Sequence, residues 1–385
     1  MKPLSNRSGR VTGKGAFDIV DRARAFEAQG VDMIHLEVGE PDFDTPEHIV
    51  AAGVWGLQNG RTRYTPVNGT PEMRGAIADY VLRTRGAAIS PANILIAPGV
   101  KSALYFTLMA LVDPGDEVLM PDPGFPGYQE ITRIAGGKPV MFSLRAENGF
   151  QPNPAEMASL ITERTKCILL NSPGNPTGTI NDSSCLQQIA ELAQRHDLWI
   201  VSDEIYAQLY YTAEFPPSIY SLPGAAERTI LLDGLSKPYA MTGWRLGFGI
   251  FPEPLVAPIA RLMANSHSCV PLFVQDAGIA ALTGPQDCVT AMRETYRQRR
   301  DGVLQAVATM PQLSATRPDG AFYVMLGMTN GRDASELCDD LLQSGVALLP
   351  CRGMGENGRQ YMRLALTKPE ERLQEALRRM KKILL

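Results

Sequence analysis

The sequence has few of the residues that build metal centres, and those it has are scattered. Its six cysteines and four histidines lie far apart along 385 residues, with no Cys-x-x-Cys pair and no histidine at zinc-ligand spacing. This distribution indicates neither a structural zinc site nor a disulfide framework, and it makes a histidine-based metal centre a poor hypothesis. We therefore expect no metal, and acid–base chemistry has to come from other side chains.

Long hydrophobic runs and an excess of positive charge are also lacking. The longest apolar stretch, residues 103–112, is broken by Thr107 and is too short to span a bilayer. The first fifteen residues include basic side chains but no apolar segment of the kind that directs secretion. The net charge of −4 offers no positive field for nucleic acid or an anionic membrane. We therefore expect a cytoplasmic protein without nucleic-acid or membrane partners.

Glycine and proline, by contrast, are abundant. There are 35 glycines and 29 prolines, more than the roughly 7% and 5% of average usage would give. Hydrophobic residues at 44% and charged residues at 20% are ordinary for a globular protein. The excess has no repeat period and predicts many specialised turns, which in a compact protein often form ligand-binding loops.

A mainly parallel sheet is predicted for the middle of the chain. Residues 47–285 alternate helical periodicity with short apolar runs that end in turn residues, a pattern typical of β–α units. Helices are expected at 102–112, after a glycine turn, and at 182–195, where Asp182 and the serines after it are suitable capping residues. The predicted strands are residues 93–97, 117–120, 139–142, 167–170, 198–202, 229–232 and 246–250.

A second, smaller α+β domain is predicted for the C-terminal part. A long charged helix at 287–309 is followed by a strand at 320–326, a helix at 334–344 and an amphipathic helix at 368–384. We divide the chain into an N-terminal arm with part of the small domain (1–46), a large domain (47–285) and a small domain (286–385).

Polar residues follow several predicted strands, where ligands bind in open parallel sheets. Strand 93–97 runs into Pro98-Gly99-Val100-Lys101 and a helix, so the N–H groups of residues 99–102 would point outward as a phosphate cradle. The segment matches neither the Walker loop nor the dinucleotide fingerprint. Taken alone, an ordinary β–α turn is the commoner interpretation.

Two further strand ends bring a carboxylate and an amine to the same crevice. Strand 198–202 ends in Asp203, with Tyr206 three residues later, which taken alone could also be a helix cap with a packed tyrosine. Strand 229–232 leads to Lys237 in a segment rich in glycine and aromatic residues. A partly desolvated lysine there would have the lowered pKa that an amine nucleophile requires, whereas a lone lysine is more often a solvated surface charge. Arg245 offers a fork for a phosphate or a carboxylate.

The combination of motifs resembles a known family over nearly the whole chain. The motifs in order are Gly39-Glu40-Pro41-Asp42-Phe43, Tyr64-Thr65-Pro66-x-x-Gly69, Asn171-Ser172-Pro173-Gly174-Asn175-Pro176-Thr177-Gly178, Asp203-x-x-Tyr206, Ser236-Lys237 with Gly243-Trp244-Arg245-x-Gly247, and Arg363-Leu364-Ala365. With these motifs the sequence resembles the class I/II aminotransferases, in the aspartate-aminotransferase-like branch of the fold-type I enzymes that use pyridoxal 5′-phosphate (PLP). The resemblance implies an α/β fold, with a mainly parallel seven-stranded sheet between helices and a smaller α+β domain.

The resemblance also implies roles for residues at the reacting centre. Lys237 matches the lysine that bonds covalently to the cofactor and then shuttles the proton. Asp203 matches the carboxylate that pairs with the pyridinium nitrogen, so that the ring can accept electrons. Tyr206 and Asn175 match the donors to the phenolic oxygen.

Other residues match those that hold the cofactor's phosphate and ring. Arg245, Ser236 and the backbone of Gly99, Val100 and Lys101 match the phosphate site. Phe125 matches the aromatic residue that stacks on the pyridine ring. Relatives often have serine three residues before the lysine, where this chain has Gly234, so the resemblance does not supply that phosphate contact.

A third group matches the substrate site and the subunit contact. Arg363, expected at the end of a strand in the small domain, matches the arginine that clamps the substrate α-carboxylate, with Gly39 and Asn175 beside it. Such a clamp selects the Cα bond that reacts. Tyr64 matches a residue that reaches the phosphate of the neighbouring subunit, which implies a homodimer with shared active sites.

The resemblance implies a ping-pong transamination between an L-amino acid and a 2-oxo acid. The protein would then be a transferase of nitrogenous groups. Lys101 resembles a lysine that meets a distal substrate carboxylate in some bacterial aspartate and prephenate aminotransferases, and a surface lysine at a helix start is the alternative. Apolar neighbours such as Phe125 and Tyr128 could instead suit an apolar or hydroxylated substrate. Arg352 is either an extra anion contact at the substrate mouth or a solvated loop charge.

Other functions are possible on the same scaffold. A PLP-dependent lyase, synthase or oxidase would use the same residues, and the outcome depends on which bond is aligned. A noncatalytic PLP-sensing regulator is disfavoured, because the stretch before Gly39 is too short for a winged helix and the chain is net acidic.

Overall fold

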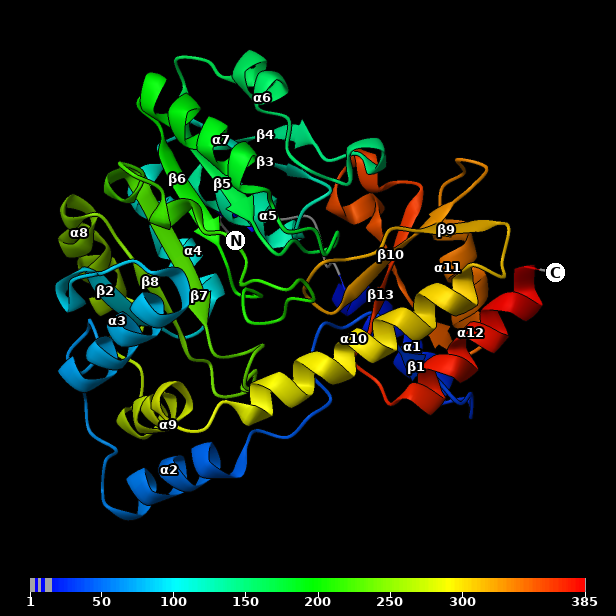
Figure 1. Ribbon diagram of the computed structural model, residues 1–385, viewed down its shortest axis with the longest axis horizontal. Helices are drawn as coiled ribbons and strands as arrows, with labels where there is room; N and C mark the ends of the chain where they lie inside the picture. Colours follow the sequence, from blue (N-terminus) through cyan, green and yellow to red (C-terminus); the bar gives the residue numbers. More distant parts are fainter. Residues whose placement is uncertain (1–3, 6–7, 11–15, 385) are drawn as a thin grey trace.

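A mixed sheet of seven strands forms the centre of the larger part of the molecule (Figure 1). The computed structural model describes residues 4–5, 8–10 and 16–384. Strand β8 runs antiparallel to both its neighbours, and the other pairs are parallel. The strands in spatial order are β2 (Ile94–Ala97), β8 (Gly247–Ile250), β7 (Thr229–Gly234), β6 (Trp199–Asp203), β5 (Thr165–Asn171), β3 (Glu117–Asp122) and β4 (Lys138–Ser143).

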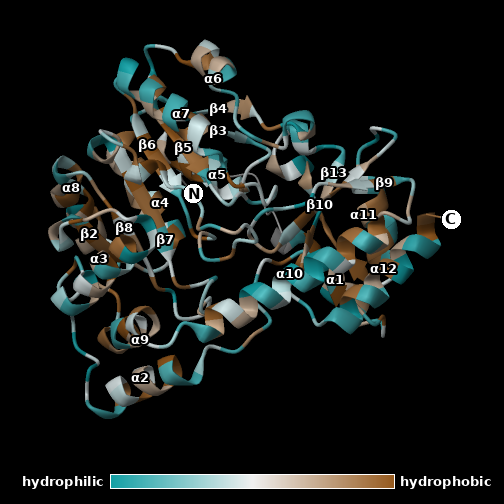
Figure 2. Cartoon of the chain, in the orientation of Figure 1, coloured by the Kyte–Doolittle hydropathy of each residue, from teal (hydrophilic) through white to brown (hydrophobic). Residues whose placement is uncertain are grey.

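Helices cover both faces of this sheet, which explains why its strands are almost continuously apolar. Alternate residues of β5 point to opposite faces, so that Leu169 packs with one set of helices and Ile168 with another. The first face carries α4 (Val100–Leu111), α5 (Pro126–Ala135) and α8 (Glu253–Ala264). The second face carries α3 (Pro71–Arg85), α6 (Pro154–Leu160), α7 (Ser183–Arg195) and α9 (Leu272–Thr283). Figure 2 shows apolar residues along the strands of this sheet and in the helices beside it.

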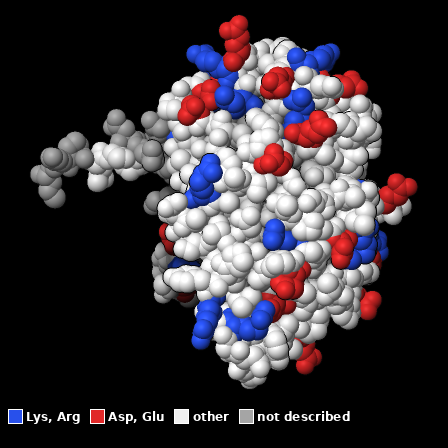
Figure 3. All heavy atoms as spheres, turned by 90° about the vertical axis from the view of Figure 1, so that its left-hand side faces the viewer, with Lys and Arg blue, Asp and Glu red and all other residues white. Residues whose placement is uncertain are grey.

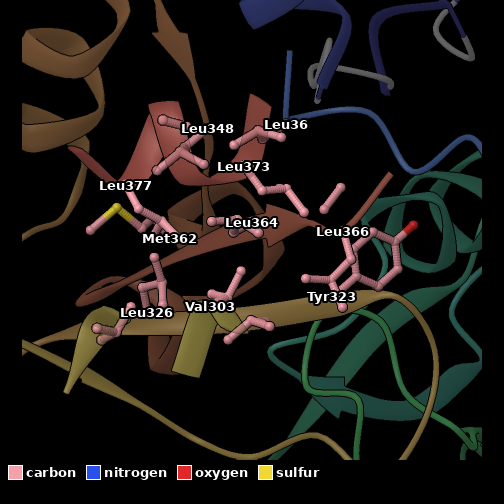
Figure 4. Close-up of a cluster of buried hydrophobic side chains, with 14 of the residues drawn as sticks. Leu36, Val303, Tyr323, Leu326, Leu348, Met362, Leu364, Leu366, Leu373 and Leu377 are labelled. Atoms are coloured by element: carbon pink, nitrogen blue, oxygen red, sulfur yellow. The ribbon is translucent and has the colours of Figure 1, made fainter. Parts of the chain in front are cut away.

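A second sheet of four strands forms the smaller part of the molecule (Figure 1). Its order is β12 (Leu349–Pro350), β13 (Tyr361–Ala365), β10 (Tyr323–Met328) and β9 (Leu313–Ala315). The long helix α10 (Asp287–Val307), α11 (Ser335–Gln343) and α12 (Glu370–Leu384) pack around it. Figure 4 shows the resulting core, where Met362 and Leu364 of β13 meet Leu373 and Leu377 of α12.

The N-terminal part joins both regions of the molecule. After α1 (Ala16–Glu27), the short strand β1 (Ile34–His35) pairs in parallel with β11 (Val346–Ala347). Helix α2 (Glu47–Gln58) then packs on α9 of the large sheet. The pairing of β1 with β11 is consistent with placing part of residues 1–46 in the small domain, and the predicted boundaries at 46 and 285 stay a prediction.

The predicted fold is confirmed, and local details differ. Each of the seven predicted strands overlaps one strand of the large sheet. Asp182 occupies the N-cap position of α7 as predicted, but its side chain makes no capping hydrogen bond. Strand β10 begins at Tyr323 rather than at residue 320, because Ala321, with φ of 58°, interrupts the extended backbone.

Two classes of feature are absent from the described part of the chain. Every helix described there is too short or too polar to cross a membrane. No three His, Cys, Asp or Glu side chains of the described residues gather where they could hold a metal ion.

Candidate active site

A cavity of about 540 Å³ lies where the carboxyl ends of β3, β5, β6 and β7 face the small sheet. The large sheet and its helices supply most of the wall, and the small sheet and the segment after β1 supply the rest. The residues predicted for the site that line this cavity are Gly39, Val100, Lys101, Phe125, Asn175, Asp203, Tyr206, Ser236, Lys237, Arg245 and Arg363.

Lys237 follows β7 and presents its amine to the cavity. Its Nζ donates a hydrogen bond to the carbonyl of Gly39 at 2.6 Å and lies 5.6 Å from the centre of the Phe322 ring. Burial, with Arg363 nearby, lowers the pKa of the amine to about 8. About a tenth of the lysine is therefore uncharged at pH 7, far more than for an ordinary lysine, and the neutral form is the one that a nucleophile or a base requires.

The lowered pKa of Lys237 predicts how cofactor capture depends on pH. Only the neutral amine attacks a carbonyl carbon, so the rate of covalent capture by the cofactor-free protein should rise with pH and level off above about 8. Stopped-flow absorbance after mixing with PLP measures this rate. A rate that keeps rising up to pH 10, the range of an ordinary lysine, would contradict the assignment.

Asp203 ends β6 and is buried, with 6% of its surface exposed. Its Oδ2 accepts a hydrogen bond from the Tyr128 hydroxyl at 2.8 Å, and its Oδ1 accepts one from the Ile205 N–H at 3.2 Å. Burial raises the pKa of this carboxyl to about 6, although both hydrogen bonds favour the ionised form. The sequence did not predict the contact between Tyr128 and Asp203, which joins residues 75 positions apart.

Tyr206 and Asn175 lie between Asp203 and the small sheet. The Tyr206 hydroxyl is 3.0 Å from that of Tyr323 in β10, a partner that sequence reasoning missed. The Asn175 N–H donates to Oδ1 of Asn171 at 2.8 Å, and its own Oδ1 accepts from Arg363 at 2.9 Å. These contacts leave the amide NH₂ group of the Asn175 side chain as a donor that can point into the cavity.

Arg363 sits in the middle of β13 and not at its end as expected, because the strand continues to Ala365. It is buried, with 4% of its surface exposed, and its guanidinium lies 4.2 Å from the centre of the Tyr323 ring. One terminal nitrogen donates to Asn175 and the other to the carbonyl of Glu37. The Nε is buried without a hydrogen-bond partner among the described residues. An unpaired buried donor on a lining arginine is a fit for an anionic ligand group.

The turn before α4 forms a concave backbone surface. Gly99 has φ of 83°, and a side chain there would collide with the guanidinium of Arg245. A side chain at Gly247 would come within 2.5 Å of the Val100 nitrogen, and one at Gly234 within 2.8 Å of a Val100 methyl group. The presence of Gly234, where relatives often have serine, therefore has a steric reason, because a serine side chain there would crowd Val100.

Fewer N–H groups are available in this turn than the sequence suggested. The Gly99 N–H donates to the carbonyl of Ala97 at 2.7 Å, and the Ser102 N–H donates to the carbonyl of Gly99 at 3.0 Å. The expectation that all four N–H groups of residues 99–102 point outward is wrong for these two. The amides of Val100 and Lys101, at the start of α4, have no intrahelical acceptor and remain for an anion.

Arg245 stands next to this turn on an unusual backbone. Its φ of 55° lies in the left-handed region, which is uncommon for a residue with a side chain. Its guanidinium donates to the carbonyl of Thr242 at 2.9 Å and stays exposed toward the cavity mouth. A strained residue held in this way is typical of a functional site.

The remaining predicted residues fall in different places. Lys101 lines the cavity with its Nζ 5.2 Å from the centre of the Phe125 ring. Arg352 is outside the cavity lining and pairs with Asp333 at 2.8 Å. Tyr64 is 89% exposed on the surface and does not line the cavity.

Comparison with known proteins identifies the class. Residues 31–380 match the model of the family described as aminotransferase class I and II. The chain is 40% identical to an arginine–pyruvate transaminase, AruH, of Pseudomonas aeruginosa, with 97% of this chain and 96% of that protein covered. It is 37% identical to an aspartate/prephenate aminotransferase of Thermus thermophilus, covering 100% and 99% of the two chains. The solved structure of an aspartate aminotransferase from Thermus thermophilus with maleate superposes with a TM-score of 0.95 at 36% identity, covering 100% of both chains.

The chain therefore belongs to the aminotransferase class I and II family. It is an aminotransferase, and its cofactor is PLP. These findings do not favour the alternatives of a lyase, synthase, oxidase or PLP-sensing regulator. The cavity fits this cofactor, because it combines an amine of lowered pKa, a buried carboxylate and a glycine turn that a side chain would fill.

Proposed function

We propose that the cavity catalyses a ping-pong exchange of an amino group between an L-amino acid and a 2-oxo acid. The observation that carries this proposal is that the amine of Lys237, the carboxylate of Asp203 and the guanidinium of Arg363 line one cavity. Bound there, PLP supplies a carbonyl carbon that amines can attack and a ring that accepts electrons from the reacting carbon.

Each residue group then has a proposed task. Arg245, Ser236 and the amides of Val100 and Lys101 hold the phosphate in the turn that Gly99 forms, and Phe125 stacks on the ring. Asp203 pairs with the ring nitrogen, while Tyr206 and Asn175 donate to the ring oxygen. The support is that all of these residues except Gly99 line the one cavity, and that Gly99 lies against Arg245. These assignments divide the cavity into a phosphate end at α4 and a substrate end at β13.

Lys237 and Arg363 are proposed to act directly on the substrate. The neutral amine of Lys237 would take the proton from the substrate Cα and deliver it to the carbon atom of the cofactor that carried the carbonyl group. Its pKa of about 8 suits this transfer. Gly39 holds that amine through its carbonyl. Arg363 binds the α-carboxylate and so fixes which Cα bond faces the cofactor. Leu349 and Met354 line the same end of the cavity and help exclude water.

The choice of substrate is proposed to depend on Lys101. The relatives' names differ, since one names arginine and pyruvate and the other aspartate and prephenate. Four basic side chains line the cavity, and three of them, Lys237, Arg245 and Arg363, have proposed roles above. Lys101 is the fourth, and burial together with Arg245 lowers the pKa of its amine. An anionic group would relieve this repulsion, so we propose that Lys101 binds the distal carboxylate of a dicarboxylic substrate.

Replacing Lys101 with glutamine tests this role. The KM for 2-oxoglutarate should rise about 10- to 100-fold, because a hydrogen bond to a charged group contributes about 1.5–3 kcal/mol. The KM for pyruvate, which lacks a distal carboxylate, should stay within about twofold. Steady-state kinetics with both acceptors measure the difference. An equal rise for both would place Lys101 at the phosphate instead.

The active unit is proposed to be a homodimer with shared sites. Tyr64 is almost fully exposed, and α2 exposes Val54, Trp55 and Leu57 by about half of their surfaces. Such a group of exposed apolar side chains is typical of a surface that another chain covers. Figure 3 shows acidic and basic side chains mixed over one face of the molecule, so that face presents no large patch of one sign. Sedimentation equilibrium should give twice the 42.0 kDa chain mass.

A cytoplasmic location is also proposed. All six cysteines are free thiols, four of them buried. Thiols stay reduced in the cytoplasm, whereas oxidising compartments favour disulfides. Cell fractionation with an antibody against the chain would test the location.

A panel of amino donors with 2-oxoglutarate and pyruvate as acceptors tests the proposed function. At least one donor should yield its 2-oxo acid together with an equal amount of the aminated acceptor. Release of ammonia without amination of an acceptor would instead indicate elimination or oxidation.

A further inference from the structure

A buried network of charges lies directly behind Asp203. Arg85, the last residue of α3, has no exposed side-chain surface. Its Nε donates to Oε2 of Glu204, and its Nη2 donates to Oδ2 of Asp233, each at 2.7 Å. Glu204 follows Asp203 at the end of β6, and Asp233 lies in β7, four positions before Lys237. One guanidinium thus joins the two strand ends that carry the proposed catalytic carboxylate and amine.

The network is bonded on every side. Oε1 of Glu204 accepts from Ser202 at 3.0 Å and from Ser218 at 2.6 Å. Asp233 accepts from the Gly234 N–H at 2.7 Å and from the Tyr80 hydroxyl at 3.2 Å. Buried charges persist only when they are paired and hydrogen-bonded, so this geometry is strongly specified.

The charges in the network do not balance. One guanidinium meets two carboxylates, and both carboxylates raise the pKa of Asp203 by repulsion. Removal of Arg85 would leave these two negative charges uncompensated beside Asp203. Asp203 also contacts Asn171 in β5 and Tyr128 in α5, and interacts with Tyr206 after β6. Lys237 after β7 lines the same cavity.

We propose that Arg85 is a positioning residue of the active site, which neutralises Glu204 and Asp233 and thereby keeps Asp203 ionised and fixed for pairing with the cofactor's ring nitrogen. This inference rests on the proposed role of Asp203. Arg85 touches neither cofactor nor substrate, because it lies behind β6 and β7 and does not line the cavity.

The test compares two substitutions with opposite electrostatic signs. Arg85→Gln removes a positive charge and Glu204→Gln removes a negative one, in the full-length protein. Equilibrium dialysis of PLP against the cofactor-free protein gives its affinity as a function of pH. Affinity should fall on acidification as Asp203 takes up a proton. The pH at the midpoint of this fall in affinity should be about one unit higher in Arg85→Gln and about one unit lower in Glu204→Gln than in the wild type. The cofactor's own ionisations are common to all variants and cancel in the comparison.

Opposite movement separates this role from a merely structural one. Structural damage would lower the unfolding temperature and the PLP affinity in both variants without moving the midpoints in opposite directions. Movement in the same direction, or an unchanged midpoint in either variant, would overturn the proposal. Arg297→Gln is the matched control, because Arg297 pairs with Glu294 on the exposed face of α10. Its midpoint should equal that of the wild type.

Two further observations keep the test decisive. If Arg85→Gln does not fold, Asp233→Asn replaces it and must lower the midpoint as Glu204→Gln does, and an unmoved midpoint overturns the proposal. A wild-type protein that neither binds PLP nor forms a 2-oxo acid would refute the proposed function itself. An active wild type whose variants keep their midpoints refutes only the role of Arg85.

Discussion

Replacing Lys237 with alanine should lower kcat by about 10⁴-fold or more while leaving PLP bound. The substitution removes the amine that attacks the cofactor and moves the substrate proton. The phosphate turn at Gly99 and the carboxylate of Asp203 are untouched, so noncovalent binding should persist. Turnover assays measure the loss, and dialysis confirms that PLP is retained.

The matched control for this substitution is Lys166→Ala. Lys166 lies in β5 and pairs with Asp116 on the surface, with 42% of its side chain exposed. Its loss should leave kcat and bound PLP unchanged. Full activity of the Lys237→Ala enzyme would refute the catalytic assignment, whatever the control shows.

The second large effect is expected for Arg363→Lys. Lysine keeps the positive charge but lacks the planar fork, so it cannot hold a carboxylate through two parallel hydrogen bonds. It also leaves the Asn175 and Glu37 oxygens without one of their donors. Truncating one partner of a buried, hydrogen-bonded charge pair costs about 2–5 kcal/mol, so kcat/KM should fall about 30- to 5000-fold.

Arg352→Lys provides the comparison for Arg363. Arg352 pairs with Asp333 and is absent from the cavity lining, so kcat/KM should change by less than about twofold. Equal losses in the two variants would mean that Arg352 approaches the substrate. Unchanged kinetics of Arg363→Lys would contradict the proposal that Arg363 binds the substrate α-carboxylate.

The strands that lead into the site could be predicted from the sequence, because their signals are local. Asp203 and Lys237 follow apolar strands, and parallel strands present their carboxyl ends at one edge of a sheet. Their positions in the cavity could therefore be predicted before any coordinates were known. The position of Arg363 within β13 was missed, because a short buried strand leaves little periodicity to mark its ends.

The partners of these residues could not be predicted from local patterns. Tyr128 and Asp203 are 75 positions apart, and Tyr206 and Tyr323 are 117 apart. Arg85 ends a helix, where a basic residue ordinarily interacts with the helix dipole at the surface. Only the tertiary packing of α3 against β6 and β7 buries it between two carboxylates.

Glycine abundance was a correct signal with an incomplete explanation. The predicted specialised turns are present beside the cavity, and two of their glycines, Gly99 and Gly247, allow close packing. Gly99 makes room for the Arg245 side chain, and Gly247 lies against the Val100 nitrogen. Close backbone approach of this kind depends on which strands become neighbours, and β2 and β7 flank β8 only in the folded sheet.

The most direct test of the central claim is a single half-reaction. The PLP-bound protein is mixed with an amino donor and no acceptor, and the 2-oxo acid formed is counted per active site. We expect one equivalent of 2-oxo acid and no ammonia, with the amino group kept by the enzyme until a 2-oxo acid is added. Continuous formation of product with release of ammonia would contradict it.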